Sequence, residues 1–158
     1  MTDENPAPDP TGFLRDFDDK QRAYKGLSES LHAANKTALF DALATAGITS
    51  VLVRFDGCGD SGQIEDIDAV AGDQPRDFPP GTIPISRAYW GATEAERSDC
   101  NVRDAVETLA YALLEETHGG WENNEGAYGE FTFTVAERAI TLEYNERYET
   151  SNYTQHVF

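Results

Sequence analysis

The sequence predicts an α+β fold: a two-layer sandwich in which two main helices cover one face of a mainly antiparallel sheet of two β-hairpins. Two observations predict it. The order helix, strand, strand occurs twice along the 158 residues, and the seven prolines fall in only two places. We therefore expect a flexible N-terminal tail over residues 1–12 and a single domain over 13–158. Within that domain, a proline-rich connection over 72–86 joins two αββ halves.

The first half begins with apolar residues at helical spacing. Phe13, Phe17 and Tyr24 predict a weak helix, and a stronger one is expected to begin near Ser28 or Ser30. Its apolar stripe consists of Leu31, Leu39, Ala42, Leu43 and Ala46, and Gly47 ends it. The β-branched run ITSVLVRF and the segment QIEDIDAV then predict two strands joined as a hairpin.

The second half repeats this order more clearly. Val102, Val106, Leu109 and Leu113 form a helical stripe, with Ser98, Asp99 or Asn101 available as its cap. The segment EFTFTVAERAITLEY alternates apolar and polar residues around a short turn at 136–138, which predicts a hairpin with one apolar and one wet face. The segment TIPISRAYW (82–90) contains a proline, so we expect at most an edge strand there.

The chain is strongly acidic, with 12 basic and 29 acidic residues and a formal charge of −17. The halves 1–80 and 81–158 carry −8 and −9, so the acidity belongs to the folded body. Such a surface repels nucleic-acid phosphates and anionic membranes, whereas it attracts basic proteins and cations. Solubility alone, or adaptation to high salt, would also explain it. Two cysteines 42 positions apart, with no signal-peptide pattern, favour a reducing cytoplasm.

Two glycine-rich acidic stretches are the candidate sites. In FDGCGDSGQIED (55–66), glycines at 57, 59 and 62 suit a tight turn between strands, but that interpretation leaves the carboxylates unexplained. In HGGWENNEGAYGE (118–130), aromatic residues rimmed by charge suggest a contact surface. The candidate binding residues are Asp56, Asp60, Ser61, Glu65, Asp66, Asp68, Trp121, Glu122, Glu125 and Tyr128.

Catalysis is poorly supported. The letters GDSG are similar to a serine-protease string, but Gln63 follows where that family has glycine-proline, and no base is placed beside Ser61, so we predict no catalytic residue. A divalent metal ion held by Asp56, Asp60, Glu65 and His118 is the alternative, which would make the protein a metal-dependent hydrolase or a cation-binding protein. On a regular strand, however, Glu65 would face away from Asp66 and Asp68. Otherwise we expect no cofactor.

Both stretches resemble an uncharacterised bacterial family, a domain of unknown function from bacterial and plasmid- or phage-related genomes. The strings that carry the resemblance are FDGCGDSGQIED, HGGWENNEGAYGEFTFTVAERAITLEYNERY and the final HVF. The resemblance implies a mobile-element or accessory setting but no reaction. It also makes His118 and Asn123 residues to test, along with the first loop, Trp121 and Glu122.

The combined expectation is an acidic protein-interaction module that binds a basic protein partner. One version is an inhibitor that mimics DNA and thereby binds a basic nucleic-acid-handling protein. We expect no direct binding to nucleic acid or membrane.

Overall fold

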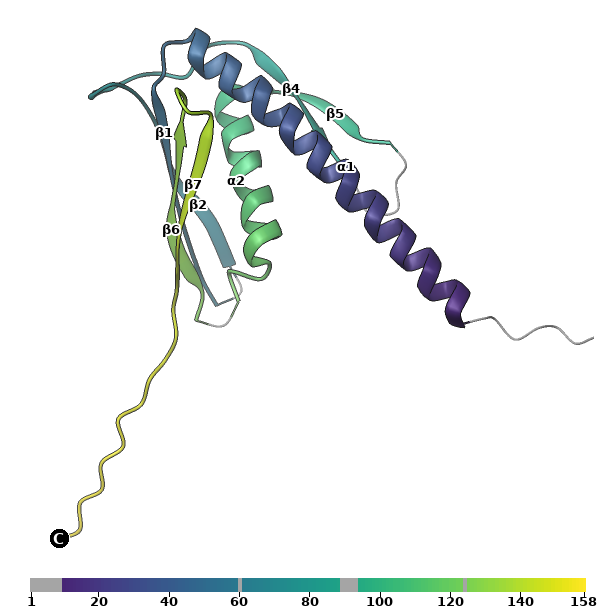
Figure 1. The fold of residues 1–158 in the computed structure, drawn as a ribbon. Coiled ribbons are helices and arrows are strands. Elements are labelled where there is room, and N and C mark those ends of the chain that lie inside the picture. Colours follow the sequence, from purple (N-terminus) through teal and green to yellow (C-terminus); the bar gives the residue numbers. More distant parts are fainter. Residues whose placement is uncertain (1–9, 60, 89–93, 124) are drawn as a thin grey trace, which may run out of the picture.

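The computed structural model describes residues 10–59, 61–88, 94–123 and 125–158, and its element order is that of an α+β protein. Two helices, α1 (Pro10–Thr45) and α2 (Val102–His118), lie on one side of a five-stranded antiparallel sheet (Figure 1). The strands of the sheet are β1 (Ser50–Cys58), β2 (Ser61–Ala71), β3 (Gln74–Pro75), β6 (Ala127–Thr134) and β7 (Ala139–Glu146). Their spatial order is β3-β2-β1-β6-β7. The predicted two-layer arrangement is confirmed.

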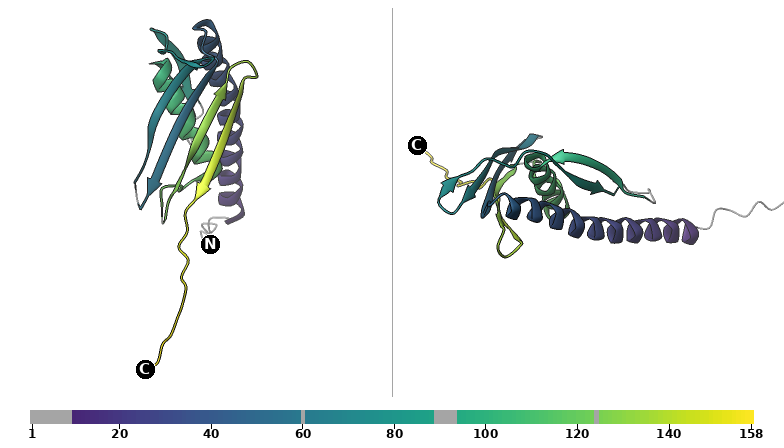
Figure 2. Two further views of the ribbon diagram at one scale, coloured as in Figure 1. Left: turned by 90° about the vertical axis from the view of Figure 1, so that its left-hand side faces the viewer. Right: turned by 90° about the horizontal axis from the view of Figure 1, so that it is seen from above.

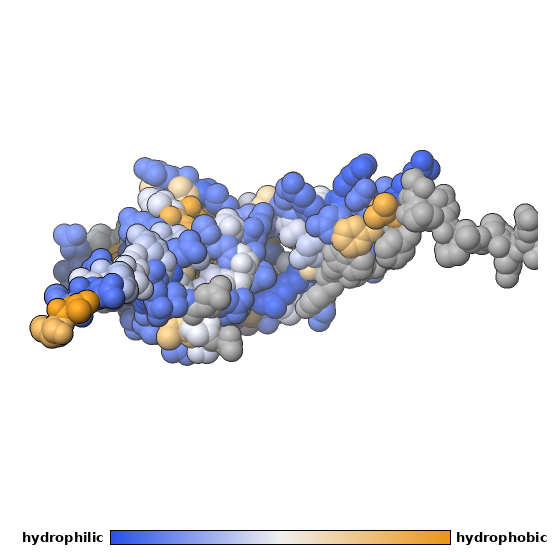
Figure 3. Space-filling model, turned by 90° about the horizontal axis from the view of Figure 1, so that it is seen from below, coloured by the Kyte–Doolittle hydropathy of each residue, from blue (hydrophilic) through white to orange (hydrophobic). Residues whose placement is uncertain are grey.

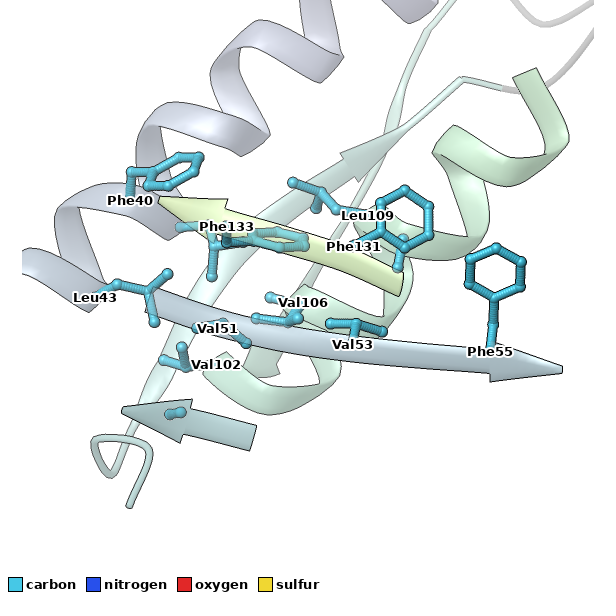
Figure 4. Packing of buried hydrophobic residues seen from close by; sticks show 14 of the residues in the cluster. Phe40, Leu43, Val51, Val53, Phe55, Val102, Val106, Leu109, Phe131 and Phe133 are labelled. Carbon is cyan, nitrogen blue, oxygen red and sulfur yellow. The ribbon is translucent and has the colours of Figure 1, made fainter. Parts of the chain in front are cut away.

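Both predicted hairpins form and lie side by side. The hairpin β1–β2 and the hairpin β6–β7 are joined through antiparallel pairing of β1 with β6, in which Val53 lies opposite Phe131 and Val51 opposite Phe133. These four side chains point toward the helices because alternate residues of a strand face opposite sides (Figure 4). The two halves of the chain therefore share one sheet and one core.

Apolar side chains of α1, α2 and the sheet fill the space between the sheet and the helices. Leu39, Phe40 and Leu43 of α1 are fully buried against it, and Phe40 contacts the ring of Phe133 with 6.1 Å between centroids. The buried residues of α2 are Val102, Ala105, Val106, Leu109, Ala110 and Leu114. Of the three predicted cap candidates, Asn101 is the N-cap, and its side chain accepts a hydrogen bond from the Asp104 amide at 2.7 Å. Leu113, predicted for the stripe, is only half-buried.

The first half contains one helix where the sequence predicted two. Helix α1 runs unbroken through Ser28 and Ser30 and ends as predicted before Gly47, whose φ is 76°. Only its last third is in the core, and the N-terminal part projects beyond the sheet (Figures 1 and 2). Residues 10–12 of the predicted tail belong to this helix, and residues 1–9 lie outside the described residues. None of the described helices has the length and apolar character needed to cross a membrane.

The segment predicted as an edge strand of the sheet pairs elsewhere. Strand β4 (Thr82–Arg87) forms a separate two-stranded ribbon with β5 (Glu96–Asn101), a segment in which the sequence had suggested only a cap. The side chain of Asn35 fixes the ribbon to α1, donating to the Ser86 carbonyl at 2.8 Å and accepting from the Ser86 amide at 2.9 Å. Ile85 is buried against the helices. Strand β4 therefore packs on the helices, and the sheet edge beside β2 is formed by β3.

Candidate interaction face on the outer side of the sheet

The side of the sheet opposite the helices is the candidate functional site. Because strand residues alternate, Val51, Val53 and Phe55 face the core while Leu52, Arg54 and Asp56 of the same strand face outward. Both helices and the β4–β5 ribbon lie toward the other side (Figure 2). No described helix and neither strand of the ribbon therefore covers the predicted wet face of the sheet.

This outer side carries six carboxylates among the described residues, which we call the acidic sheet face. Its members are Asp56, Glu65, Asp66, Asp68, Glu130 and Glu143. Pairing register places Asp66, Arg54, Glu130 and Glu143 in one row across four neighbouring strands. Only two guanidinium groups, those of Arg54 and Arg147, accompany these carboxylates in the described part of the chain.

Arg54 lies between two carboxylates of its row. Its Nε donates to Oε2 of Glu130 at 3.3 Å, and its Nη1 lies 3.9 Å from Oδ2 of Asp66. All three side chains are solvent-accessible, so each ion pair contributes at most about 1 kcal/mol. Glu143, directly opposite Glu130, therefore adds a negative charge that Arg54 does not neutralise.

Arg147 directly follows β7 and lies beside the cross-strand pair Asp56–Tyr128. Its Nη1 donates to Oδ1 of Asp56 at 2.9 Å and to the carbonyl of Gly57 at 3.1 Å. The guanidinium carbon lies 4.6 Å from the ring centroid of Tyr128, which is 45% exposed. The hydrogen bond that it donates to Asp56 raises the pKa of Arg147 above its already high ordinary value. Arg147 and Tyr128 thus form a positive and aromatic border beside the first hairpin.

A shallow hollow of about 260 Å³ lies at the tip of the first hairpin. It is lined by Asp56, Cys58, Ser61, Gly62, Gln63 and Glu65. The expectation that Glu65 faces away from Asp66 is wrong, because the register shifts between Arg54 and Phe55 and leaves Glu65 as an unpaired bulge residue. The bulge lets Glu65 line the same hollow as Asp56. The predicted site residue Asp60 lies outside the described residues.

The second acidic stretch lies on the opposite side of the same hairpin. Trp121 is only 7% exposed, and its ring contacts Phe55 edge-on with 5.4 Å between centroids. Glu122 follows it against the backbone of Gly62 and is half-buried, while Asn123 and Glu125 are exposed in the same loop. Trp121 is therefore a core residue and Tyr128 the exposed aromatic of this stretch.

His118 lies with Trp121 on the helix side of the sheet. It stacks on Tyr144 with 3.6 Å between ring centroids and an interplanar angle of 3°. Asp56 and Glu65 line the outer hollow, so the sheet separates them from His118. No three His, Cys, Asp or Glu side chains form a metal-binding group in the described ranges. Ser61 also lies in the hollow, on the side of the sheet away from His118.

Sequence reasoning missed the two arginines and two of the carboxylates. Glu130 and Glu143 occupy polar positions of the alternating segment EFTFTVAERAITLEY, and Arg54 has the same place in ITSVLVRF. Once the two hairpins are aligned, these positions meet in one row. Arg147 had no sequence signal, since it follows the last strand and returns to Asp56 across 91 positions.

Comparison with known proteins gives a family but no activity. The chain belongs to the family described as "Family of unknown function (DUF6878)", whose model matches residues 31–158. Neither a curated protein nor a solved structure matches the chain significantly. The match contains the whole sheet, α2 and residues 31–45 of α1, so the acidic sheet face lies within the family region.

Proposed function

We propose that the protein is an acidic interaction module that binds a basic protein through the acidic sheet face. The single observation that supports this is the acidic sheet face itself, on which the described residues include six carboxylates and two guanidinium groups, both engaged by carboxylates of that face. A surface of this kind attracts a basic partner over long range and speeds its association.

The layout of the charges supports one partner class. The carboxylates are spread over four adjacent strands, and neighbouring strands of a sheet lie about 4.8 Å apart. They form a two-dimensional array of negative charges, comparable to the phosphates that a nucleic-acid-binding protein contacts. We therefore propose a basic nucleic-acid-handling protein as the partner and inhibition by DNA mimicry as the mode of action. A cytoplasmic, bacterial or mobile-element setting fits two unpaired cysteines and the family resemblance.

The test compares two double charge reversals with the same change in net charge. Asp66→Lys with Glu130→Lys alters the acidic sheet face, whereas Glu115→Lys with Glu116→Lys alters exposed residues at the end of α2. Each protein is used as bait in lysate of the source organism at low and high salt, and the retained proteins are identified by mass spectrometry. We expect a basic protein that the native bait and the α2 variant retain at low salt and that the sheet variant loses.

The identified partner is then titrated calorimetrically at several salt concentrations. Binding through exposed charges weakens as salt is added, because the charges are screened. Equal loss in both variants would show that total charge alone matters, and binding that is indifferent to salt would contradict the mimic.

A cation site is the second candidate function, favoured by the hollow that Asp56 and Glu65 share. Since His118 lies across the sheet, such a site would offer oxygen ligands and select a hard cation such as Ca²⁺ or Mg²⁺. A ligand that binds only the native state raises the melting temperature. Scans with Ca²⁺, Mg²⁺, Mn²⁺, Zn²⁺ and chelator therefore test it, and identical melting curves would eliminate it.

A further inference from the structure

The C-terminal segment 147–158 leaves the body of the protein directly after β7. It has no regular secondary structure, and every residue from Tyr148 to Phe158 is exposed. Both views show it running away from the sheet as an extended chain (Figures 1 and 2). We call residues 148–158 the C-terminal tail.

The composition of this tail is that of a strand. Six of its eleven residues favour β-structure: Tyr148, Thr150, Tyr153, Thr154, Val157 and Phe158. It contains neither glycine nor proline. Tyr148, Tyr153 and Val157 are 79%, 83% and 87% exposed, and the tip of the tail is apolar (Figure 3). Apolar side chains that gather at an exposed site, as the adjacent Val157 and Phe158 do, are typical of binding surfaces.

Among the described strands, none pairs with the outer edge of β7, from which the tail emerges. In the described residues, β7 pairs only with β6, through eight consecutive pairs without a bulge. Its inward side chains Ile140, Leu142 and Tyr144 are only partly buried. A long, regular, unpaired edge of this kind is a template for another strand.

The opposite border of the sheet, where β3 covers β2 only at Val70 and Ala71, is less suited to pairing. Strand β2 carries the bulge at Glu65, and Glu65, Asp66 and Asp68 are exposed along it. Bulges and charged residues are the features by which sheet edges resist added strands. The edge of β7 is therefore the favoured docking position in this sheet.

The tail continues β7 in the chain, so it would need a tight reversal to pair with the edge of its own strand. With no glycine or proline after Tyr148, the sequence provides no such turn. The same edge in a second molecule can be reached without any turn. We propose that two copies of this chain form a two-fold symmetric dimer, in which the C-terminal tail of each adds as a strand to the edge of β7 in the other.

Area and charge support this arrangement. Three aromatic side chains per tail at about 150 Å² each, counted in both copies, would bury about 900 Å² before any backbone is included, which approaches the 1,200–2,000 Å² of stable interfaces. The tail carries Glu149 as its only charged side chain of the Asp, Glu, Lys and Arg types. It can therefore lie along another copy with less repulsion than any segment of the acidic sheet face would meet.

The first test is the mass in solution, measured by sedimentation equilibrium over a wide range of concentration. We expect the full chain to have twice the 17.4 kDa of one chain, and a chain ending at Arg147 to be a monomer. A full-length variant with Ser151→Pro and Thr154→Pro should also be monomeric, because one of these two positions donates to the neighbouring strand in any register. The matched variant with Ser151→Ala and Thr154→Ala should remain dimeric. A monomeric full chain, or a dimer that survives truncation, would overturn the proposal.

The second test locates the contact. A spin label on His156→Cys, in a chain with Cys58→Ser and Cys100→Ser, is mixed with unlabelled, isotope-enriched chain. We expect selective broadening of amide signals from Ala139–Glu146 in the enriched copy, whereas broadening at Ser61–Ala71 would overturn the assignment to β7. Backbone pairing of this kind persists at high salt, unlike binding at the acidic sheet face, so the two proposals fail independently.

Discussion

The ring of Trp121 lies against the cross-strand pair Gly57–Gly62, where neither glycine leaves room for a side chain. A Cβ atom at Gly57 would be 2.6 Å from the Trp121 ring, and one at Gly62 would be 2.5 Å from it. Gly57 and Gly62 are directly opposite each other in β1 and β2, on the helix side. The two acidic stretches are therefore interlocked, since a glycine platform in the first holds the tryptophan of the second.

This contact predicts that a single methyl group added at Gly62 destabilises the protein. Gly62→Ala forces the Trp121 ring to move within a packed core, so we expect a loss of about 1–3 kcal/mol in the free energy of unfolding. Urea denaturation followed by circular dichroism measures it. In a Trp121→Leu background the same substitution should cost much less, because the ring that it meets is absent.

The matched control is Gly26→Ala in α1, where no atom lies within 4 Å of the added carbon. Alanine is favoured over glycine in a helix by about 1 kcal/mol, so this variant should be neutral or stabilised. Equal losses at Gly26 and Gly62 would contradict the role assigned to the Trp121 ring.

A second prediction concerns the bulge that directs Glu65 to the hollow. The amide of Ile64, next to the bulge, donates to the hydroxyl of Tyr111 on α2 at 2.9 Å. Tyr111→Phe leaves this half-buried amide without its acceptor, so we expect a loss of about 1 kcal/mol and faster hydrogen exchange at Ile64. Exchange measured by NMR would contradict this role if the Ile64 amide stayed as protected as in the native chain.

Alkaline pH should destabilise the protein through Tyr144. Burial, together with Glu146 and Glu122, raises the pKa of Tyr144 above its ordinary value of 10.0. The folded state then holds this proton more tightly than the unfolded state does. Its contribution to stability is complete below pH 10 and is lost as pH rises through the folded pKa. Tyr144→Phe should flatten the decline in urea midpoint above pH 10, and an unchanged decline would assign it to other groups.

The sequence predicted the elements whose pattern is local. The alternation of Val51, Val53 and Phe55 and the stripe of Val102, Val106 and Leu109 identify buried faces without any knowledge of neighbours. The continuous α1 was missed because its N-terminal part is largely exposed and gives only a weak apolar period. Strand β5 was missed because ERSDCN has almost no apolar residue, and its partner β4 is held to α1 by Asn35, a contact that the sequence pattern does not show.

The candidate site was predicted in composition but not in geometry. The turn interpretation of the first glycines holds for Gly59, whose φ is 65°, whereas Gly57 and Gly62 serve the close approach of Trp121. A signal for this was present, because Gly57 continues the inward positions 51, 53 and 55. Glu65 lies on the outer side of the sheet because of a bulge, and His118 lies on the helix side, where it stacks on Tyr144. Neither feature can be predicted from the spacing of residues in the sequence.

The last prediction separates a functional charge from a tolerated one. Glu130 and Glu143 are directly opposite on β6 and β7, and like charges in that relation destabilise a sheet by about 0.2–1 kcal/mol. Glu143→Lys replaces the repulsion by attraction, so we expect a higher urea midpoint together with weaker binding to the basic partner. Glu115→Lys, far from this row, should leave binding unchanged. A Glu143→Lys protein that is more stable and binds equally well would show that this carboxylate has no part in recognition. The repulsion between Glu130 and Glu143 would then only destabilise the fold.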